Sequence, residues 1–321
     1  MSSIFVKNSI QEILKTIYEN IYLKFENKFI YVFLCGGSCK ENSKEIRNDI
    51  RDLLLKNENI SVLYPEDVFF EKNEKKLFPD KDLLELETVL ANNSDIVCII
   101  CESYGSASEL GAFTNRLDNA LINKVVSVIY SNFEGDSSFI NDGPIHRIKK
   151  NNKNNACVYD NKQENKNKLC NDLLNVFKNI KRNHKQDIII KQNSVLTSFI
   201  SLASLYLMLI YFLKPISGMK LERYTEEFLN EMKVRYEKDN RDLSFYHKIA
   251  IRYLVNSEYI KYENENSSDF ILTEKGNNYV EKHLKTTITN PKDIKRLENL
   301  KYTTIYNRLY TKNKKKGDYV S

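Results

Sequence analysis

The stretch Glu102-Ser-Tyr-Gly-Ser-Ala-Ser-Glu-Leu-Gly-Ala-Phe113 directly follows an apolar run, Asp95-Ile-Val-Cys-Ile-Ile-Cys101. The run has the length and β-branched content of a strand that is buried on both faces. We expect a turn at Gly105 and a helix that Ser106 or Ser108 caps. Glu109 would then lie in the first helical turn, near the positive end of the helix dipole. Ligands bind at the carboxyl ends of strands in open α/β sheets, so Glu109 is the first candidate for chemistry.

The same alternation of strand and helix extends from the first strand to about residue 181. Apolar runs predict five strands, at 29–35, 60–64, 95–101, 124–130 and 156–160. Apolar residues at three-to-four spacing predict helices between and after them, at 43–56, 81–93, 108–117 and 165–181. An amphipathic helix over 4–25 is expected to pack on this domain. The pattern predicts an α/β fold, a Rossmann-like doubly wound parallel sheet.

Polar residues follow the first two strands as well. Gly36, Gly37 and Ser38 come after the first strand, and Glu66 and Asp67 come after the second. A Gly-Gly turn without a GxGxxG pattern is weak evidence for a nucleotide site, since it is as often a plain tight turn. Glu87 stands in the helix over 81–93, where a solvated face is the simpler interpretation.

The second half of the chain begins with Val195 to Leu213, nineteen residues without a charge. That length could span a membrane, but the many hydroxyl side chains and the charged flanking sequence favour a buried core or dimer-interface helix. Helices at 221–237 and 243–257, a strand-turn-strand and the ending Phe270-Ile-Leu-Thr-Glu-Lys-Gly276 then predict a mostly α winged helix-turn-helix domain.

Basic residues of the presumed recognition helix are candidates for nucleic-acid contact, although winged helices also serve protein contacts. The candidates are Arg241, His247, Lys248 and Arg252. A basic tail, Lys312-Asn-Lys-Lys-Lys316, would add salt-sensitive attraction to phosphate or simply keep the chain soluble. The net charge of +6 over 321 residues allows a nucleic-acid partner without requiring one.

Composition also bears on metal chemistry and on location. Cys98 and Cys101 are an odd offset apart, so a strand would point them to opposite faces, and the six cysteines complete no zinc-ligand pattern. We therefore expect no metal site. The N-terminus lacks the features of a secretory signal, and we expect a cytoplasmic protein with no membrane span.

Four motifs, in order and at compatible spacing, carry a resemblance to a known family. They are Phe33-Leu-Cys-Gly-Gly37, Tyr64-Pro-Glu-Asp67, Glu102 to Phe113, and Ser138-Phe-Ile-Asn-Asp-Gly-Pro144. Together they resemble the effector proteins of bacterial anti-phage retrons, which join a nucleoside 2-deoxyribosyltransferase-like domain to a C-terminal winged helix. The expected domains are 1–185 for the enzyme-like part, 186–290 for the winged helix, and 291–321 for an extension with the basic tail.

The resemblance implies an N-glycosidase in which Glu109 attacks the anomeric carbon of a ribosyl group. Gly36, Gly37 and Ser38 would approach ribose or phosphate, and Glu66, Asp67 and Glu102 would face the base or the ribose hydroxyls. Gly105 and Ser106 would lie against the same ligand, with a helix cap as the alternative for Ser106. True deoxyribosyltransferases carry an Asp-Ser-Gly-Thr-like turn where this chain has Glu102-Ser-Tyr-Gly-Ser. That departure leaves room for a larger substrate such as NAD, which would be a substrate and not a cofactor.

The same resemblance implies a toxin that the retron reverse transcriptase and its RNA–DNA hybrid (msDNA) hold in check, in a homo-oligomer or a larger complex. Two other interpretations stay open. A phosphoribohydrolase also places a glutamate after a glycine turn, but its Pro-Gly-Gly-x-Gly-Thr signature is absent here. A non-enzymatic nucleotide sensor with a DNA-binding winged helix would use the same glutamate only to bind ribose.

Overall fold

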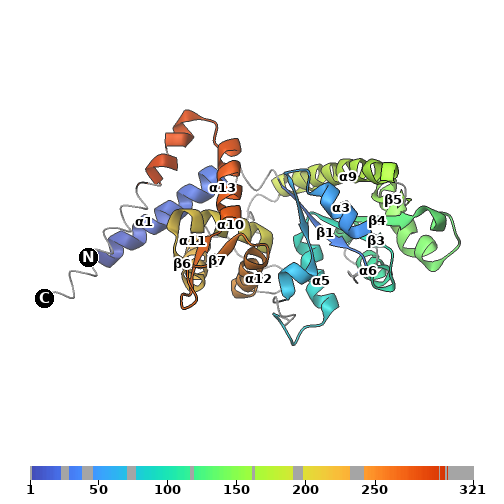
Figure 1. Ribbon diagram of the computed structural model, residues 1–321, viewed down its shortest axis with the longest axis horizontal. Helices are drawn as coiled ribbons and strands as arrows, with labels where there is room; N and C mark the ends of the chain where they lie inside the picture. Colours follow the sequence, from blue (N-terminus) through green and yellow to red (C-terminus); the bar gives the residue numbers. More distant parts are fainter. Residues whose placement is uncertain are drawn as a thin grey trace. The chain divides into compact units, whose positions relative to one another are not determined.

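The computed structural model describes residues 2–22, 29–37, 46–70, 77–115, 119–160, 163–190, 198–231, 242–295, 297–300 and 302. Contacts between residues divide the chain into two units. One unit, here the sheet unit, is Phe29–Gln192, and the other, the winged-helix unit, combines Met1–Lys28 with Asn193–Ser321. Figure 1 shows the elements of both.

Five parallel strands form the centre of the sheet unit, in the order β2-β1-β3-β4-β5. Their bounds are Ile30–Cys35 for β1, Ile60–Leu63 for β2, Ile96–Cys101 for β3, Val125–Tyr130 for β4 and Ala156–Tyr159 for β5. Each strand lies within the range that its apolar run predicts. Most of their residues are buried, as expected of a parallel sheet with both faces covered.

Helices cover both faces of this sheet (Figure 1). Apolar residues of α3 (Ile46–Leu54) and α9 (Gln163–Ile190) pack with Ile30, Val32 and Leu34 of β1. On the opposite face, the Phe33 ring meets the ring of Phe113 from α6 (Tyr104–Thr114) at 6.0 Å between centroids, and α5 (Leu83–Asn93) packs beside α6. The doubly wound Rossmann-like prediction is therefore confirmed.

Short helical segments complete the sheet unit. They are α4 (Pro65–Phe69), α7 (Asn119–Ile122), α8 (His146–Asn151), the 3-10 turns Ser131–Phe133 and Lys153–Asn155, and the π-helical turn Asn141–Ile145. α4 begins with a proline immediately after the residue that ends the second apolar run, so it places Glu66 and Asp67 at the carboxyl end of β2. That placement agrees with the sequence prediction.

The order of helices and strands in the winged-helix unit is that of a winged helix-turn-helix domain. Helix α10 (Phe199–Leu213) leads to β6 (Ile216–Ser217), α11 (Gly218–Glu231), α12 (Leu243–Asn256), β7 (Ile260–Tyr262), β8 (Asp269–Leu272) and α13 (Glu274–Thr287). The three strands form an antiparallel sheet in the order β6-β8-β7. Two helices followed by a β7–β8 hairpin form the predicted winged helix-turn-helix.

The end of the wing explains why the motif requires threonine and glycine. Thr273 caps α13, because its side-chain oxygen accepts a hydrogen bond from the Gly276 N–H at 3.0 Å. A side chain at Gly276 would place its Cβ 2.1 Å from the carbonyl oxygen of Tyr259. The backbone of the wing therefore approaches the helix more closely than any other residue type permits.

The long uncharged segment is a buried helix of this unit. Thirteen of its fifteen residues in α10 are buried, and the helix packs on α12, α13 and β8. The expectation of a core helix is confirmed for residues 199–213. Across the described part of the chain, no helix combines the length and apolarity that crossing a membrane needs.

The opening helix corrects one prediction. α1 (Ser2–Ile17) and the π-helical turn Tyr18–Tyr22 belong to the winged-helix unit and not to the domain that follows them in sequence. Gln11 donates a hydrogen bond to Glu227 of α11 at 3.1 Å, and the Tyr18 ring lies edge-on to Phe228 at 5.1 Å. The amphipathic pattern predicted a buried face correctly, but the surface that covers this face comes from more than 200 residues further along the chain. The predicted boundary at residue 1 of the enzyme-like domain is therefore wrong.

The predicted extension at 291–321 is helical at 291–295 and 297–300. Its basic tail lies outside the described residues, and so do Ser38 and Arg241.

Candidate active site

The carboxyl ends of β1 and β3 lie side by side at the point where the strand order reverses. Open α/β sheets bind ligands at this point, because the chain leaves the two strands toward opposite faces. Gly36 and Gly37 follow β1, and Glu102 follows β3. The Gly37 N–H donates a hydrogen bond to Oε1 of Glu102 at 3.2 Å. The structure thus brings together two of the predicted site residues from separate loops.

Helix α6 begins earlier than the sequence suggested. Ser103 is its N-cap, and Ser103 and Ser106 exchange hydrogen bonds between their side chains and backbone N–H groups at 3.0–3.1 Å. The prediction of a cap at Ser106 or Ser108 is wrong in position, because the reciprocal pair fixes the start at Tyr104. Gly105 lies within the first turn of α6, and Glu109 lies in its second turn.

Glu109 is the half-buried acid of this edge, and one of its carboxyl oxygens is fully buried. Its Oε2 atom is inaccessible to solvent and has no hydrogen-bond partner among the described residues. Burial, followed by the negative charge of Glu87, raises the pKa of Glu109 to about 8. The Arg47 charge and a hydrogen bond from the Cys35 thiol act in the opposite direction, and Glu66 adds a small upward effect. A buried polar atom without a partner is uncommon and marks a candidate site for a ligand or for chemistry.

Glu87 is the residue that sequence reasoning missed. It is buried on α5, with 7% of its surface exposed, so the solvated-face interpretation is wrong. Burial and the charge of Glu66 raise the pKa of Glu87 to about 7. One signal was available in the sequence, since Glu87 is three residues before Leu90 and shares the face of that buried side chain.

Arg47 is the cation of the site. It opens α3 and is 6% exposed, its guanidinium lies 4.7 Å from the centre of the Tyr64 ring, and its Nη2 is 3.8 Å from Oε1 of Glu66. A Cβ at Gly36 would lie only 2.9 Å from Cδ of Arg47. Gly36 therefore makes room for the arginine stem, a role that its expected contact with ribose or phosphate did not include.

The other predicted positions differ in accessibility. Glu66 is exposed and Asp67 is half-buried on α4, while Gly105 and Tyr104 are exposed at the start of α6. Ser106 is buried, 1% exposed, and its side chain accepts a hydrogen bond from the backbone N–H of the N-cap Ser103. This bond completes the capping box, and the contact of Ser106 with a ligand stays a prediction.

The cysteines of the described chain are all free thiols: Cys35, Cys98, Cys101, Cys157 and Cys170. Cys98 packs in the core on the α3 and α9 face, whereas the charge of Glu109 contributes to the raised pKa of Cys101 from the other side. The two thiols thus lie on opposite faces, as predicted. Within the described ranges, no three His, Cys, Asp or Glu side chains are placed to hold a metal ion.

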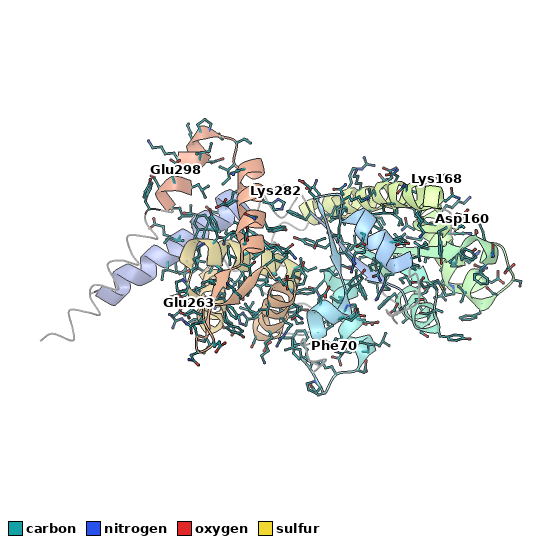
Figure 2. The ribbon with its side chains drawn as sticks, viewed as in Figure 1. Phe70, Asp160, Lys168, Glu263, Lys282 and Glu298 are labelled. Atoms are coloured by element: carbon teal, nitrogen blue, oxygen red, sulfur yellow. The ribbon has the colours of Figure 1, made fainter. Side chains whose placement is uncertain are left out.

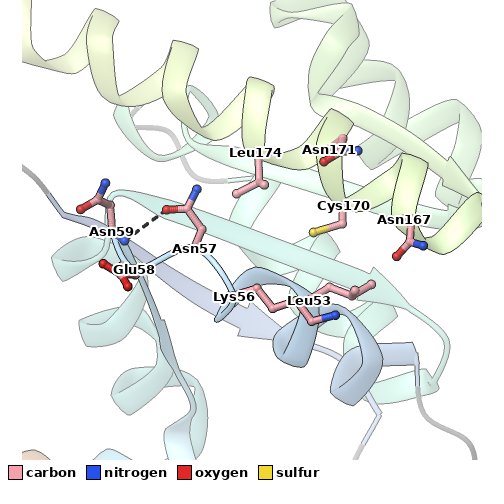
Figure 3. A pocket seen from close by; sticks show the side chains of 9 residues that line it. All are labelled: Leu53, Lys56, Asn57, Glu58, Asn59, Asn167, Cys170, Asn171 and Leu174. Atoms are coloured by element: carbon pink, nitrogen blue, oxygen red, sulfur yellow. Dashed lines mark hydrogen bonds between the residues drawn. The ribbon is translucent and has the colours of Figure 1, made fainter.

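A groove of about 600 Å³ lies between the end of α3 and the start of α9 (Figure 3). Its lining is mostly amide and aliphatic side chains: Leu53, Lys56, Asn57, Glu58, Asn59, Asn167, Cys170, Asn171 and Leu174. Asn59 directly precedes β2, so the groove lies at the amino edge of the sheet, opposite to the acids. The carboxyl edge is the stronger candidate site, because Glu87 and Glu109, the carboxyl groups with raised pKa values, are there.

The candidate nucleic-acid residues on α12 separate into two kinds. Lys248 is exposed and Arg252 is half-buried. His247 is 8% exposed, and its Nδ1 lies 2.8 Å from the hydroxyl of Tyr206. Its Nε2 is 3.9 Å from Oε2 of Glu222. The prediction of a nucleic-acid contact for His247 is therefore wrong, because its ring is part of the core between α10, α11 and α12.

The wing has mixed charge. Lys261, Glu263 and Glu265 are exposed along β7 and the turn after it, and Figure 2 labels Glu263 there. Acidic residues on the wing would repel phosphate, so Lys248 and Arg252 are the stronger candidates for a phosphate contact.

Comparison with known proteins identifies a family for this chain. The model of the "STM3845 retron effector protein" family matches residues 43–262, about two thirds of the chain. The chain belongs to this retron effector family. The match ends with β7 of the wing, so it includes most of the winged helix. In the sheet unit it includes Glu66, Glu87 and Glu109, the acids at the carboxyl edge of the sheet.

Two Escherichia coli relatives of this retron effector carry names that mention an activity. The chain described here is 31% identical over 150 residues to "Retron Ec86 putative ribosyltransferase/DNA-binding protein". This alignment covers 47% of each of the two chains. It is 33% identical over 122 residues, 37% of each chain, to "Retron Ec73 putative ribosyltransferase/DNA-binding protein". The alignments thus span less than half the length of the relatives.

Proposed function

We propose that this retron effector is a toxin that cleaves the N-glycosidic bond of NAD, or of a related nucleotide or nucleoside, with Glu109 as the nucleophile. One observation carries the proposal: Oε2 of Glu109 is buried without a hydrogen-bond partner among the described residues, at the carboxyl edge where two loops meet. The names of the two E. coli relatives support a ribosyl-transfer chemistry.

The proposed reaction has two covalent steps. In the first, a Glu109 oxygen bonds to the anomeric carbon while the bond from that carbon to the base nitrogen breaks, and its electron pair leaves with the base. In the second, water attacks the same carbon and the ester bond to Glu109 breaks. A sugar hydroxyl in place of water would make the reaction a transfer.

The electrostatics of the site favour a substrate whose base is cationic before the glycosidic bond breaks. Burial and the charges of Glu87 and Glu66 raise the pKa of Glu109 to about 8, while Glu66 also raises the pKa of Glu87. A pyridinium ring next to Glu109 would stabilise the ionised carboxylate, because opposite charges lower the pKa of an acid. Nicotinamide then leaves as a neutral molecule that needs no proton.

Glu87 is suited to carry protons for this reaction. Its pKa of about 7 lets it exchange a proton near neutral pH, which is the property of an effective general acid or base. It would accept the proton of the attacking water and would donate a proton to a nucleoside base, which cannot leave as easily as nicotinamide.

For control of the toxin, we propose contacts with the retron reverse transcriptase and its RNA–DNA hybrid. The exposed Lys248 and the half-buried Arg252 lie four residues apart on α12, on one side of the helix. They would contact phosphates, and affinity would fall with rising salt. The names of the relatives, which include DNA binding, support this part of the proposal.

The test is a metabolite profile of cells that express the complete retron, before and after phage infection. We expect NAD to fall and nicotinamide to rise with the wild-type effector, and neither change with Glu109→Gln, which keeps the shape but cannot form the ester. A fall in nucleosides would assign the same chemistry to another substrate. Unchanged metabolites with the wild type, or equal losses with Glu109→Gln, would contradict the proposal and favour a nucleotide sensor.

A further inference from the structure

Arg47 is buried to a degree that arginine rarely reaches without a purpose, since its side chain is 8% exposed. Its stem lies against Gly36, where a Cβ would approach Cδ, Cβ and Cγ of Arg47 to 2.9, 3.1 and 3.2 Å. The position directly after β1 is therefore a glycine, because any side chain at Gly36 would collide with the stem of Arg47.

The guanidinium at the end of that stem is held in place by two groups. The Tyr64 ring lies 4.7 Å from it, a distance at which a cation is attracted to the ring face. Oε1 of Glu66 lies 3.8 Å from Nη2 of Arg47. Arg47 is therefore a fixed positive charge, unlike a surface arginine that moves through many rotamers.

Burial and two neighbouring acids disfavour the charged form of Glu109, and two other groups favour it. Glu87 from α5 and Glu66 from α4 are acids, while Cys35 from β1 donates a hydrogen bond to it, and Cys101 from β3 is affected by its charge. Arg47 from α3 is the positive charge that lowers the pKa of Glu109. Its effect is opposed by burial and by two carboxylates.

We propose that Arg47 is a positioning residue for the reaction: its charge, lodged against Gly36 and Tyr64, favours the ionised, attacking form of Glu109 against the opposing effect of the surrounding carboxylates. This inference rests on the proposed function. It assigns to Arg47 no contact with the substrate, and it explains why an arginine is buried beside Gly36 at the end of β1.

The test uses the pH dependence of kcat/KM for base release by the activated retron complex, with NAD as the substrate. In the wild type, kcat/KM should rise with pH as Glu109 ionises. Arg47→Gln should move the midpoint upward by about one pH unit, so activity falls about tenfold below the midpoint and recovers above pH 9. Arg47→Lys, which keeps the charge, should restore most of the original midpoint.

Arg51→Gln is the matched control. Arg51 is on the same helix, one turn further, and its guanidinium also lies over Tyr64, at 5.8 Å, but it is bonded to Asp52 and is partly exposed. Arg51→Gln removes the same charge and should leave the midpoint in place. An equal loss at every pH with Arg47→Gln, or a midpoint that does not move, would overturn the inference.

A second measurement separates this inference from the proposed function. The melting-temperature difference caused by Glu109→Gln reports the ionisation of Glu109 without any substrate, and it should level off at a pH about one unit higher in the Arg47→Gln background. If that shift occurs but the wild type releases no base, the proposed function fails and the electrostatic role of Arg47 stands. If the wild type releases base but the shift is missing, the role of Arg47 alone is refuted.

Discussion

His247 is a buried titratable side chain and Glu109 a half-buried one, one in each unit, and their surroundings differ in kind. Nδ1 of His247 lies 2.8 Å from the Tyr206 hydroxyl, and burial lowers the pKa of His247 so that the ring is neutral. Glu109 has a buried oxygen without a hydrogen-bond partner among the described residues, and two neighbouring acids make its ionisation harder still. The burial of His247 is compensated by local contacts, whereas the burial of Glu109 is not.

The difference separates a side chain that stabilises the fold from one that is available for chemistry. A neutral ring with a hydrogen bond costs little to bury, and the core around it gains specificity. A carboxyl group without a partner costs free energy in the resting protein, and this cost can be recovered only when something cationic arrives. The sequence suggested a functional role for both residues; the structure places His247 in the core, and the catalytic role of Glu109 stays a prediction.

The largest expected effect on activity is that of Glu87→Gln, and it tests whether the acids near Glu109 are available for chemistry. If the acids around Glu109 carry protons, Glu87→Gln should reduce base release from a nucleoside by about 100-fold, since a positioned general acid typically contributes this much. The loss with NAD should be at least about tenfold smaller, because nicotinamide leaves without a proton.

The measurement is kcat for base release from NAD and from a nucleoside, each with the wild type and with Glu87→Gln. Glu85→Gln is the control, because Glu85 is on the same helix, forms a surface ion pair with Lys81 and is not among the groups that shift the pKa of Glu109. Equal losses for both substrates would remove Glu87 from the proton-transfer role.

A smaller effect is expected at His247. His247→Ala removes the partner of a buried tyrosine hydroxyl and should cost about 1–3 kcal/mol of unfolding free energy. The loss should shrink as the pH falls below about 6.5, because the native state disfavours the charged ring and the unfolded state then binds the proton more readily.

Calorimetry of the wild type, His247→Ala and Lys248→Ala checks this prediction. Lys248→Ala changes the next, exposed residue and should alter stability by less than about 0.5 kcal/mol while it weakens binding to the RNA–DNA hybrid. A stable His247→Ala protein with reduced hybrid affinity would reverse our assignment and return His247 to the interface.

Much of the fold could be predicted from the sequence because its signals are local. The five apolar runs and the helices between them have periods that depend only on neighbouring residues. The same holds for the ending Phe270 to Gly276, whose threonine cap and glycine lie within four residues of each other. Glu109 was found because it closely follows a buried strand.

The sequence predictions were wrong where the structure depends on contacts between distant residues, or where several nearby residues could fill the same role. Ser103, Ser106 and Ser108 can all cap a helix, and the reciprocal bonds between Ser103 and Ser106 select the first. The pattern of α1 shows that one face is buried but does not show that α11 covers it. Glu87 and Arg47 are polar residues on apolar faces, and only the folded sheet unit brings both to Glu109.

The most direct test of the central claim is the pH dependence of the melting temperature of the wild type and Glu109→Gln. Burial raises the pKa of Glu109 from 4.5 to about 8, so the native state holds its proton more tightly than the unfolded state, and stability is lost as the pH rises through that range. We predict equal melting temperatures near pH 4.5 and a Glu109→Gln protein more stable by roughly 3–6 °C at pH 8.5. A difference that is the same at every pH, or a less stable variant at pH 8.5, would contradict the account, because Glu109 would then be an ordinary, compensated side chain.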